Sequence, residues 1–278
     1  MAEIYFFFIL LSIFFNKTFP FPSKSFIQRN SHENMLRLMN LSPYENAEEL
    51  SGQFEGDIII SPKQLNELFK QNSKTGLIDL KYRWTNNIVP YQIKVKDFDT
   101  AQIHHIENAI RTLENATCIK FVEYQADVHV NYVWVTGEDG GCYSSVGMQG
   151  GRQRLNLQSY KIESGCFRLY TIVHEFIHAL GFYHMQSASN RDDYVKIVWK
   201  NIQDGAEHNF NAYSADKIHM YGEPYDYESV MHYSDTAFSK NGEKTIIPLT
   251  ELNDGVTMGQ RVKMTQHDID RINAMYCK

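Results

Sequence analysis

Apolar and polar residues alternate along several short stretches in the first half of the chain, as they do in strands that are buried on one face. The clearest case is Tyr-Gln-Ile-Lys-Val at residues 91–95. Residues 119–124, 128–135 and 154–157 are predicted to form further strands. Glycine-rich residues 137–151 are predicted to form a loop between the last two.

Other segments have the apolar spacing of a helix. The first can begin at Asp99 or Thr100, both of which are good N-cap residues. Its apolar face consists of Ile103, Ile106, Ile110 and Leu113. A second helix is predicted over residues 166–180, and a final helix begins at Thr265, with Asp268 three residues on as its capping partner. The inward face of the final helix consists of Ile269, Ile272 and Met275. Most of the chain between the last two helices is predicted to be irregular.

The first 74 residues differ from the rest of the chain. Residues 4–15 form an apolar run that suits a signal-peptide core and is too short to span a bilayer, and no other run is long enough for a membrane span. Residues 1–22 are therefore predicted to be a signal peptide, although Glu3 stands where a basic residue is usual. A buried N-terminal helix is the alternative. Residues 23–74 are polar, with few apolar residues in phase, and are predicted to be a propeptide rather than an independent domain.

Net charge and cysteine content narrow the possible class of protein further. A formal net charge of −6 gives no indication of nucleic-acid binding. All cysteines follow the predicted propeptide: Cys118, Cys142, Cys166 and Cys277. Behind a signal peptide, four cysteines indicate two disulfides, for which three connectivities are possible. A zinc site of cysteine and histidine is the alternative, but no two cysteines are close in sequence. Asn115 begins the one glycosylation sequon after residue 74, and it is predicted to be glycosylated.

The strongest functional signal is His-Glu-Phe-Ile-His-Ala-Leu-Gly-Phe-Tyr-His at residues 174–184. His174 and His178 lie one helical turn apart, so both imidazoles can bind one cation. A glycine then permits the left-handed conformation that ends a helix, and His184 supplies a third ligand. Three neutral nitrogens around one Zn²⁺ leave a position for water, and Glu175 is placed to take a proton from that water. A helix with structural histidines is the alternative.

A second motif, Ser-Val-Met-His-Tyr at residues 229–233, lies downstream. It resembles the Met-turn that lies beneath the zinc site of metzincins. Met231 is expected to form an apolar floor under the histidines without binding the metal. Tyr233 carries a phenol that can reach the metal. An ordinary buried turn is the alternative.

Together these motifs resemble the astacin family of secreted zinc endopeptidases, which belongs to the metzincin group. The resemblance rests on residues 181–184, 191–195 and 229–233. It extends over about residues 75–278, through segments at residues 82–84, 88–91, 118–121 and 272–277.

The resemblance implies an α+β fold with two subdomains. The N-terminal half is expected to contain a mixed twisted sheet and long helices, with the zinc helix at the cleft. The C-terminal half is expected to be mostly irregular and to end in a helix. The protease domain is expected to span residues 75–278 after an activating protease cuts behind Lys74. The resemblance also implies the disulfides Cys118–Cys277 and Cys142–Cys166.

Phe-Glu-Gly-Asp at residues 54–57 resembles the FxGD motif of astacin propeptides. Asp57 is then expected to bind the metal in the zymogen, with Gly56 letting the backbone approach it. Tyr233 is expected to be a fifth ligand at rest and a hydrogen-bond donor in the transition state. One residue departs from the family pattern: Met185 follows the third histidine, where the family usually has a Glu that tethers the mature N-terminus.

The expected function is that of a secreted, monomeric zinc endopeptidase, made as a zymogen. It is expected to hydrolyse proteins and peptides with zinc-activated water and Glu175 as general base. An inactive zinc-binding regulatory protein on the same fold is the alternative, and the presence of both Glu175 and Tyr233 argues against it. The basic residues that can favour acidic substrate side chains are Arg191, Lys240, Lys244, Arg261 and Lys263. Seven further histidines after residue 74 are expected to lie at the surface or to be satisfied in the core: His104, His105, His129, His208, His219, His232 and His267.

Overall fold

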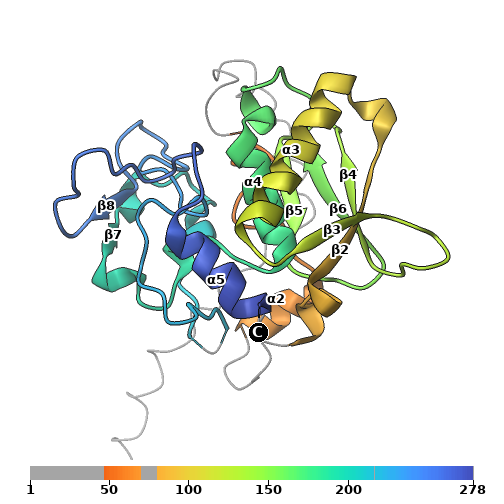
Figure 1. Ribbon diagram of the computed structural model, residues 1–278. Helices are drawn as coiled ribbons and strands as arrows, with labels where there is room; N and C mark the ends of the chain where they lie inside the picture. The colour runs from red at the N-terminus through yellow and green to blue at the C-terminus, as the bar shows by residue number, and fades with distance from the viewer. Residues whose placement is uncertain (1–46, 70–79, 216, 278) are drawn as a thin grey trace, which may run out of the picture.

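The computed structural model describes residues 47–69, 80–215 and 217–277 (Figure 1). The predicted signal peptide and the predicted cut behind Lys74 lie outside these residues. Within the described residues, no helix has both the length and the apolar character needed to cross a membrane.

A six-stranded mixed sheet forms much of the N-terminal half, with the strand order β1-β5-β6-β4-β2-β3 (Figure 1). Its strands are β1 (Ile58–Ile59), β2 (Ile88–Ile93), β3 (Lys120–Glu123), β4 (Tyr132–Thr136), β5 (Cys142–Ser145) and β6 (Arg152–Leu157). Strands β5 and β6 run antiparallel, whereas all other neighbours run parallel. The predicted strands near residues 91, 120 and 155 are therefore confirmed, with bounds that differ by a few residues.

The strand predicted over residues 128–135 begins only at Tyr132. The residues before it form a turn, in which the N–H groups of Val128 and His129 donate to the carbonyl oxygen of Gln125. Val128 and Val130 are exposed in this turn, so their apolar character does not reflect burial in a sheet.

Strand β5 contradicts the prediction of a loop over residues 137–151. All of its residues are buried, so it lacks the alternation by which a half-buried strand is recognised. Gly141 and Gly147 flank it at φ values of +85° and +67°, which end the extended backbone on both sides. Strand β1, from the predicted propeptide, pairs in parallel with β5 and forms the edge of the sheet.

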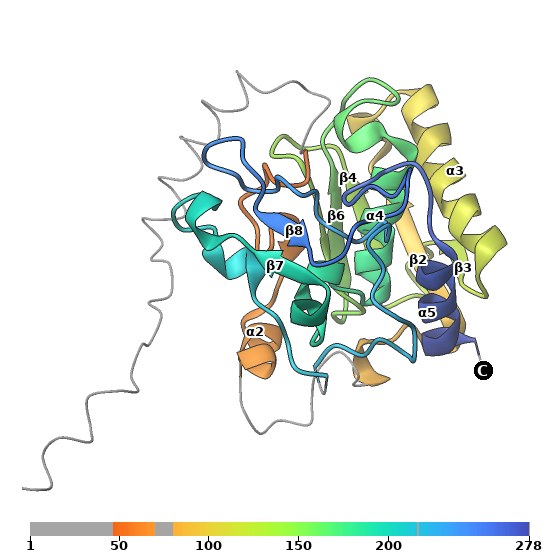
Figure 2. The ribbon, with the colours of Figure 1, turned by 90° about the vertical axis from the view of Figure 1, so that its left-hand side faces the viewer.

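Helices α3 (Thr100–Ala116) and α4 (Leu169–Leu180) lie side by side on one face of the sheet (Figures 1 and 2). Asp99 caps α3 by accepting a hydrogen bond from the Gln102 N–H at 2.8 Å, and the Gln102 side chain accepts one from the Asp99 N–H. Three residues of the predicted apolar face are buried, namely Ile106, Ile110 and Leu113. The amphipathic pattern therefore places α3 correctly against the core.

Helix α4 begins at Leu169, three residues later than predicted, because Arg168 has an extended backbone and Gly165–Phe167 form a separate 3₁₀ turn. It ends, as predicted, at Gly181, which takes the left-handed conformation with a φ of +113°. This glycine therefore determines where the chain leaves the helix and turns back.

The C-terminal half contains the short antiparallel strands β7 (Val195–Ile197) and β8 (Ile246–Pro248) and helix α5 (Gln266–Tyr276), and is otherwise mostly irregular, as expected (Figure 1). Thr265 and Asp268 form the predicted capping box of α5. A separate apolar cluster around Phe210 and Ile246 stabilises this half.

Two disulfides link elements that are distant in sequence. Cys118, just after α3, is bonded to Cys277, just after α5. Cys142, in β5, is bonded to Cys166, in the turn before α4. This is the connectivity that the family resemblance implies.

Residues 47–69 of the predicted propeptide pack against the rest of the chain and have no separate core. Ile58 and Leu68, the latter in helix α2 (Pro62–Phe69), share a buried cluster with later residues, namely Tyr82, Val146, Tyr183 and Tyr213. Near the start of the segment, Glu48 contacts the C-terminal half at Arg261, while β1 extends the sheet of the N-terminal half. This segment therefore contacts both halves.

Candidate metal centre

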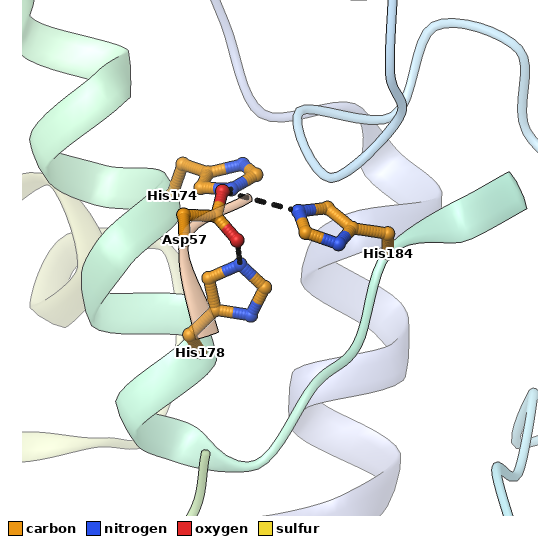
Figure 3. Close-up of side chains that lie close together, drawn as sticks. All are labelled: Asp57, His174, His178 and His184. Atoms are coloured by element: carbon orange, nitrogen blue, oxygen red, sulfur yellow. Dashed lines mark hydrogen bonds and ion pairs between the residues drawn. The ribbon is translucent and has the colours of Figure 1, made fainter. Parts of the chain in front are cut away.

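Helix α4 presents His174 and His178 from the same face, one turn apart (Figure 3). Their ring centroids are 4.6 Å apart. After Gly181 the chain reverses, and His184 approaches these two rings from the opposite side (Figure 3). Its ring centroid lies 5.3 Å from that of His174 and 4.7 Å from that of His178. The structure thus brings the three predicted ligands together.

The Nδ1 atom of each histidine faces an oxygen atom outside this group. His174 Nδ1 is 2.8 Å from the Val230 carbonyl oxygen, and His178 Nδ1 is 2.7 Å from that of Phe182. Carbonyl oxygens only accept hydrogen bonds, so Nδ1 carries the proton and Nε2 is left with a lone pair. His184 Nδ1 lies 2.9 Å from the Glu55 carboxylate, which accepts from a protonated Nδ1 and leaves Nε2 to bind a proton or a metal cation.

The Asp57 carboxylate lies between the three imidazoles (Figure 3). Its Oδ2 is 3.1 Å from His174 Nε2 and 3.2 Å from His184 Nε2. Its Oδ1 is 3.4 Å from His178 Nε2. The four ligand atoms lie within 4.8 Å of one another, and all four side chains are buried. Imidazole nitrogens and a carboxylate oxygen are the ligands that zinc takes in proteins.

Electrostatics also favours a cation at this position. Burial opposes the charged form of His184, but the carboxylates of Asp57 and Glu55 outweigh it and raise the pKa of His184 to about 9. Burial lowers the pKa of His174 to about 4, so this ring is neutral near pH 7. His178 Nε2 and Asp57 Oδ1 are buried, and neither has a hydrogen-bond partner in the described part of the chain. A metal cation satisfies these two atoms and balances the buried negative charge, so the residues fit zinc.

Glu175 is fully buried beside the first ligand, and neither of its carboxylate oxygens has a hydrogen-bond partner among the described residues. Burial, and after it the negative charge of Asp57, raise the pKa of Glu175 well above its usual range. Its environment therefore favours proton uptake, which suits a carboxylate that accepts a proton.

The Met-turn is anchored by α5. The capping residue Asp268 accepts hydrogen bonds from the Ser229 hydroxyl at 2.6 Å and from the Val230 N–H at 2.9 Å. Arg271 donates to the same carboxylate at 2.7 Å, within a buried ion pair. Since the Val230 carbonyl holds His174, the cap of α5 supports a metal ligand. The sequence indicates Asp268 as a cap, but nothing in it indicates this second contact.

Tyr233 is buried, and its hydroxyl donates to the backbone carbonyl oxygen of Glu55 at 2.6 Å. Its ring centroid lies 4.6 Å from that of His184. The hydroxyl is thus occupied by the same segment that carries Asp57. Gly56, between Glu55 and Asp57, has a φ of +85°, and a Cβ there would lie 2.8 Å from the Phe238 ring. This glycine is therefore needed for its backbone conformation and for close packing on Phe238.

Sequence reasoning overlooked Glu55. Its carboxylate is buried and contacts His184, Ser187 and Tyr213. Glu55 has a left-handed φ of +49° and lies in a turn, so neither strand nor helix periodicity in the sequence points to it. Nothing in the sequence indicates its partners, which follow it by more than 120 residues.

The family model of the astacin peptidases matches residues 76–277. The chain belongs to the astacin family. It is a zinc metalloendopeptidase by this membership, and the buried group of His174, His178, His184 and Asp57 is able to hold the metal ion.

Similar astacins occur in several animals. Zinc metalloproteinase nas-4 of Caenorhabditis elegans is 40% identical, over 80% of this chain and 68% of that protein. Seminal metalloprotease 1 of Drosophila melanogaster is 37% identical, over 84% of this chain and 90% of that protein. Human meprin A subunit beta is 39% identical over 80% of this chain, which spans 29% of that subunit.

A solved structure has the same fold. High choriolytic enzyme 1, a hatching enzyme zinc-protease from Oryzias latipes, superposes with a TM-score of 0.62 at 37% identity. The match covers 70% of this chain and 92% of the enzyme. The astacin fold, with its mixed sheet, helices and histidine cluster, is therefore confirmed.

The basic residues considered for substrate preference in this astacin all have carboxylate partners. The pairs are Arg191–Asp192, Lys240–Asp204, Lys244–Asp235, Lys263–Glu228 and Arg261–Glu48. Glu48 alone among these partners belongs to the predicted propeptide. Burial raises the pKa of Glu48, but the charge of Arg261 outweighs it and brings the pKa to about 2. Arg261 therefore holds an ionised propeptide carboxylate.

The other residues singled out in the sequence are not among the four side chains that face the metal position. His232 is buried, with its ring nitrogens 2.7 Å from the Tyr225 hydroxyl and the Tyr233 carbonyl. Met231 is buried in the main core, and its carbonyl accepts from the Met185 N–H. Asn115 is exposed near the end of α3, where its glycosylation stays a prediction.

Proposed function

We propose that the chain is made as a latent, secreted endopeptidase, cut behind Lys74 to give a mature protease of residues 75–278. The signal-peptide pattern of residues 1–22 supports secretion, as do two disulfides, which persist in oxidising compartments. The proposed substrates are proteins and peptides, and the mature form is proposed to be a monomer.

One observation carries the proposal of latency: the Asp57 carboxylate lies among the three Nε2 atoms that face the metal position. There it takes the ligand position that water needs for hydrolysis. The carbonyl of Glu55 simultaneously occupies the Tyr233 hydroxyl. The same short segment of propeptide therefore blocks both the position of the catalytic water and the Tyr233 hydroxyl.

In the mature enzyme, Glu175 is the proposed general base. Zinc, when bound, supplies Lewis acidity that activates water and polarises a peptide carbonyl. Glu175 takes a proton from the attacking water and passes it to the leaving amine. Tyr233, freed from Glu55, is the proposed fifth ligand at rest and donates a hydrogen bond to the oxyanion that develops on the substrate carbonyl. A phenol suits this step because it is neutral and protonated at working pH.

Arg261 is the proposed determinant of a preference for acidic substrate side chains. Its guanidinium donates two hydrogen bonds to the Glu48 carboxylate, at 2.9 and 3.0 Å. Removal of the propeptide leaves this buried cation without its partner, and a substrate carboxylate can then replace Glu48.

The test compares the purified chain before and after the cut behind Lys74, on a short quenched peptide. Silence before the cut and cleavage after it are expected, with loss of activity in a chelator and recovery on addition of zinc. A matured, zinc-loaded protein that cuts none of a diverse peptide library would overturn the proposal. That result would favour the inactive zinc-binding alternative.

A further inference from the structure

The Glu55 side chain is buried in the protease part of the molecule. Its Oε2 lies 2.9 Å from His184 Nδ1. Its Oε1 accepts hydrogen bonds from the Tyr213 hydroxyl at 2.5 Å and from the Ser187 hydroxyl at 3.3 Å. A buried carboxylate is stable only with such donors, and here all three belong to residues 75–278.

Contacts within the protease part hold these three donors in place without Glu55. The Ser187 N–H donates to the His184 carbonyl at 3.2 Å, and the Tyr213 N–H donates to the Ser187 carbonyl at 2.9 Å. Arg191 bridges the two segments by donating to the carbonyl oxygens of Gln186, at 3.0 Å, and Phe210, at 2.7 Å. The donors are therefore positioned by contacts that do not involve the propeptide.

The chemistry of these groups selects an anion. When His184 Nε2 faces the metal position, its Nδ1 carries a proton and can only donate. Burial, and after it the Glu55 carboxylate, raise the pKa of Tyr213 well above its usual range, so its hydroxyl stays protonated. With the Ser187 hydroxyl, three donors converge on one position, and a carboxylate is the planar acceptor that fits two oxygens among them.

We propose that His184, Ser187 and Tyr213 form a carboxylate-binding subsite beside the metal, which Glu55 fills in the uncleaved chain and an acidic substrate side chain fills in the mature enzyme. The inference rests on the proposed function, because it requires that the propeptide be removed. The subsite is distinct from Arg261, since a different propeptide carboxylate, that of Glu48, occupies that residue.

The subsite lies close to the scissile bond. The carbonyl of Glu55 accepts from the Tyr233 hydroxyl, the proposed oxyanion donor, while the side chain of the same residue fills the subsite. A substrate carbonyl at Tyr233 therefore brings a neighbouring side chain within reach of the three donors. The acidic residue is expected next to the cleaved bond.

The test measures binding and not turnover. Mature protein carrying Glu175→Gln is titrated with fluorescent peptides that have Glu or Gln at each position in turn, and anisotropy gives Kd. At the position bound by this subsite, Glu is expected to bind about tenfold more tightly than Gln, since hydrogen bonds to a charged acceptor are among the stronger ones. Any Glu preference due to Arg261 is expected at a different position. Tyr213→Phe and Ser187→Ala are expected to reduce this preference severalfold, and Arg261→Ala to leave it. Tyr227→Phe, which removes a hydroxyl bonded to the Tyr194 carbonyl, is the matched control.

Two results would overturn the subsite. One is equal affinity for Glu and Gln at every position. The other is that every position with a Glu preference keeps it in Tyr213→Phe protein and loses it in Arg261→Ala protein. If free glutarate displaces bound peptide but no peptide position prefers Glu over Gln, the three donors bind small carboxylates only. That result would refute a role in peptide recognition. Thermal unfolding of each variant detects misfolding.

A synthetic peptide of residues 47–59 gives a second measurement that does not depend on the choice of substrate. Glu55→Gln in this peptide is expected to weaken its binding to the mature protein about tenfold, and to have much less effect on Tyr213→Phe protein. Additive effects of the two changes would contradict direct contact. Cleavage of peptides by the wild-type mature enzyme is measured separately. An active enzyme that shows no Glu preference at this subsite refutes only the subsite. An inactive enzyme refutes the proposed function.

Discussion

Replacing Tyr233 with Phe is expected to affect the uncleaved and mature forms in opposite directions. In the uncleaved chain the Tyr233 hydroxyl donates to the Glu55 carbonyl at 2.6 Å, and both residues are buried. Loss of a neutral hydrogen bond that leaves a buried carbonyl unpaired costs about 1–2 kcal/mol. The affinity of the propeptide for the protease should therefore fall by a factor of about 5–30.

In the mature enzyme the same hydroxyl is proposed to act on the transition state. Removal of one oxyanion donor costs about 2.7 kcal/mol, or about a hundredfold in kcat. KM should change little, because the donor contributes mainly when charge has developed on the substrate oxygen. The same substitution is thus expected to lower the affinity of the propeptide for the protease and to lower kcat of the mature enzyme.

The assay determines kcat and KM of matured wild-type and Tyr233→Phe protein on a short quenched peptide. The hold of the propeptide is measured as inhibition by a synthetic peptide of residues 47–59, which includes Glu55 and Asp57. Tyr227→Phe serves as the control for loss of a tyrosine hydroxyl elsewhere. An unchanged kcat would refute the role of Tyr233 as a donor in the transition state, and unchanged inhibition would refute the contribution of its bond to Glu55.

Three further changes test other parts of the site. Glu175→Gln should retain zinc, measured by atomic absorption, and lose most activity, since the ligands remain while the proton acceptor is lost; turnover near that of the wild type would contradict this. Asp57→Ala, in a chain made uncleavable at Lys74, should be partly active before any cut because the metal position reopens, whereas silence equal to that of the uncleavable parent would mean that steric cover alone maintains latency. Asp268→Ala should lower the free energy of unfolding by about 3–5 kcal/mol, because Arg271 is left buried without its partner; a denaturant titration with a loss below about 1 kcal/mol would argue against this account.

Local sequence signals predicted the parts of this fold that depend on local physics. The cap at Thr265 involves Asp268 three residues on, so the sequence contains both partners, and both were predicted. Asp99 was predicted as one of two possible N-cap residues, and the structure adds Gln102 as its partner. Gly181 marked the end of α4 for the same reason, because only its own backbone conformation is needed. The three histidines followed from their fixed spacing on either side of that glycine.

Features that depend on distant partners could not be predicted in this way. Strand β5 is buried on both faces and shows no alternation, so only its neighbours β1 and β6 identify it as a strand. Glu55 acquires its role from Ser187 and Tyr213, which belong to the C-terminal half of the chain. The second contact of Asp268 likewise requires that α5 fold back onto the Met-turn. In each case tertiary packing, and not local pattern, determines the role.

The bond between Cys118 and Cys277 spans a sequence separation of 159 residues, and that span includes the zinc helix and the Met-turn. A single nick anywhere within it, including one made by another copy of the protease, leaves both fragments covalently joined. Such a molecule migrates as one band on a gel without reductant and separates into two with it. Self-digestion inside this span is therefore detected by size only when a reductant is present.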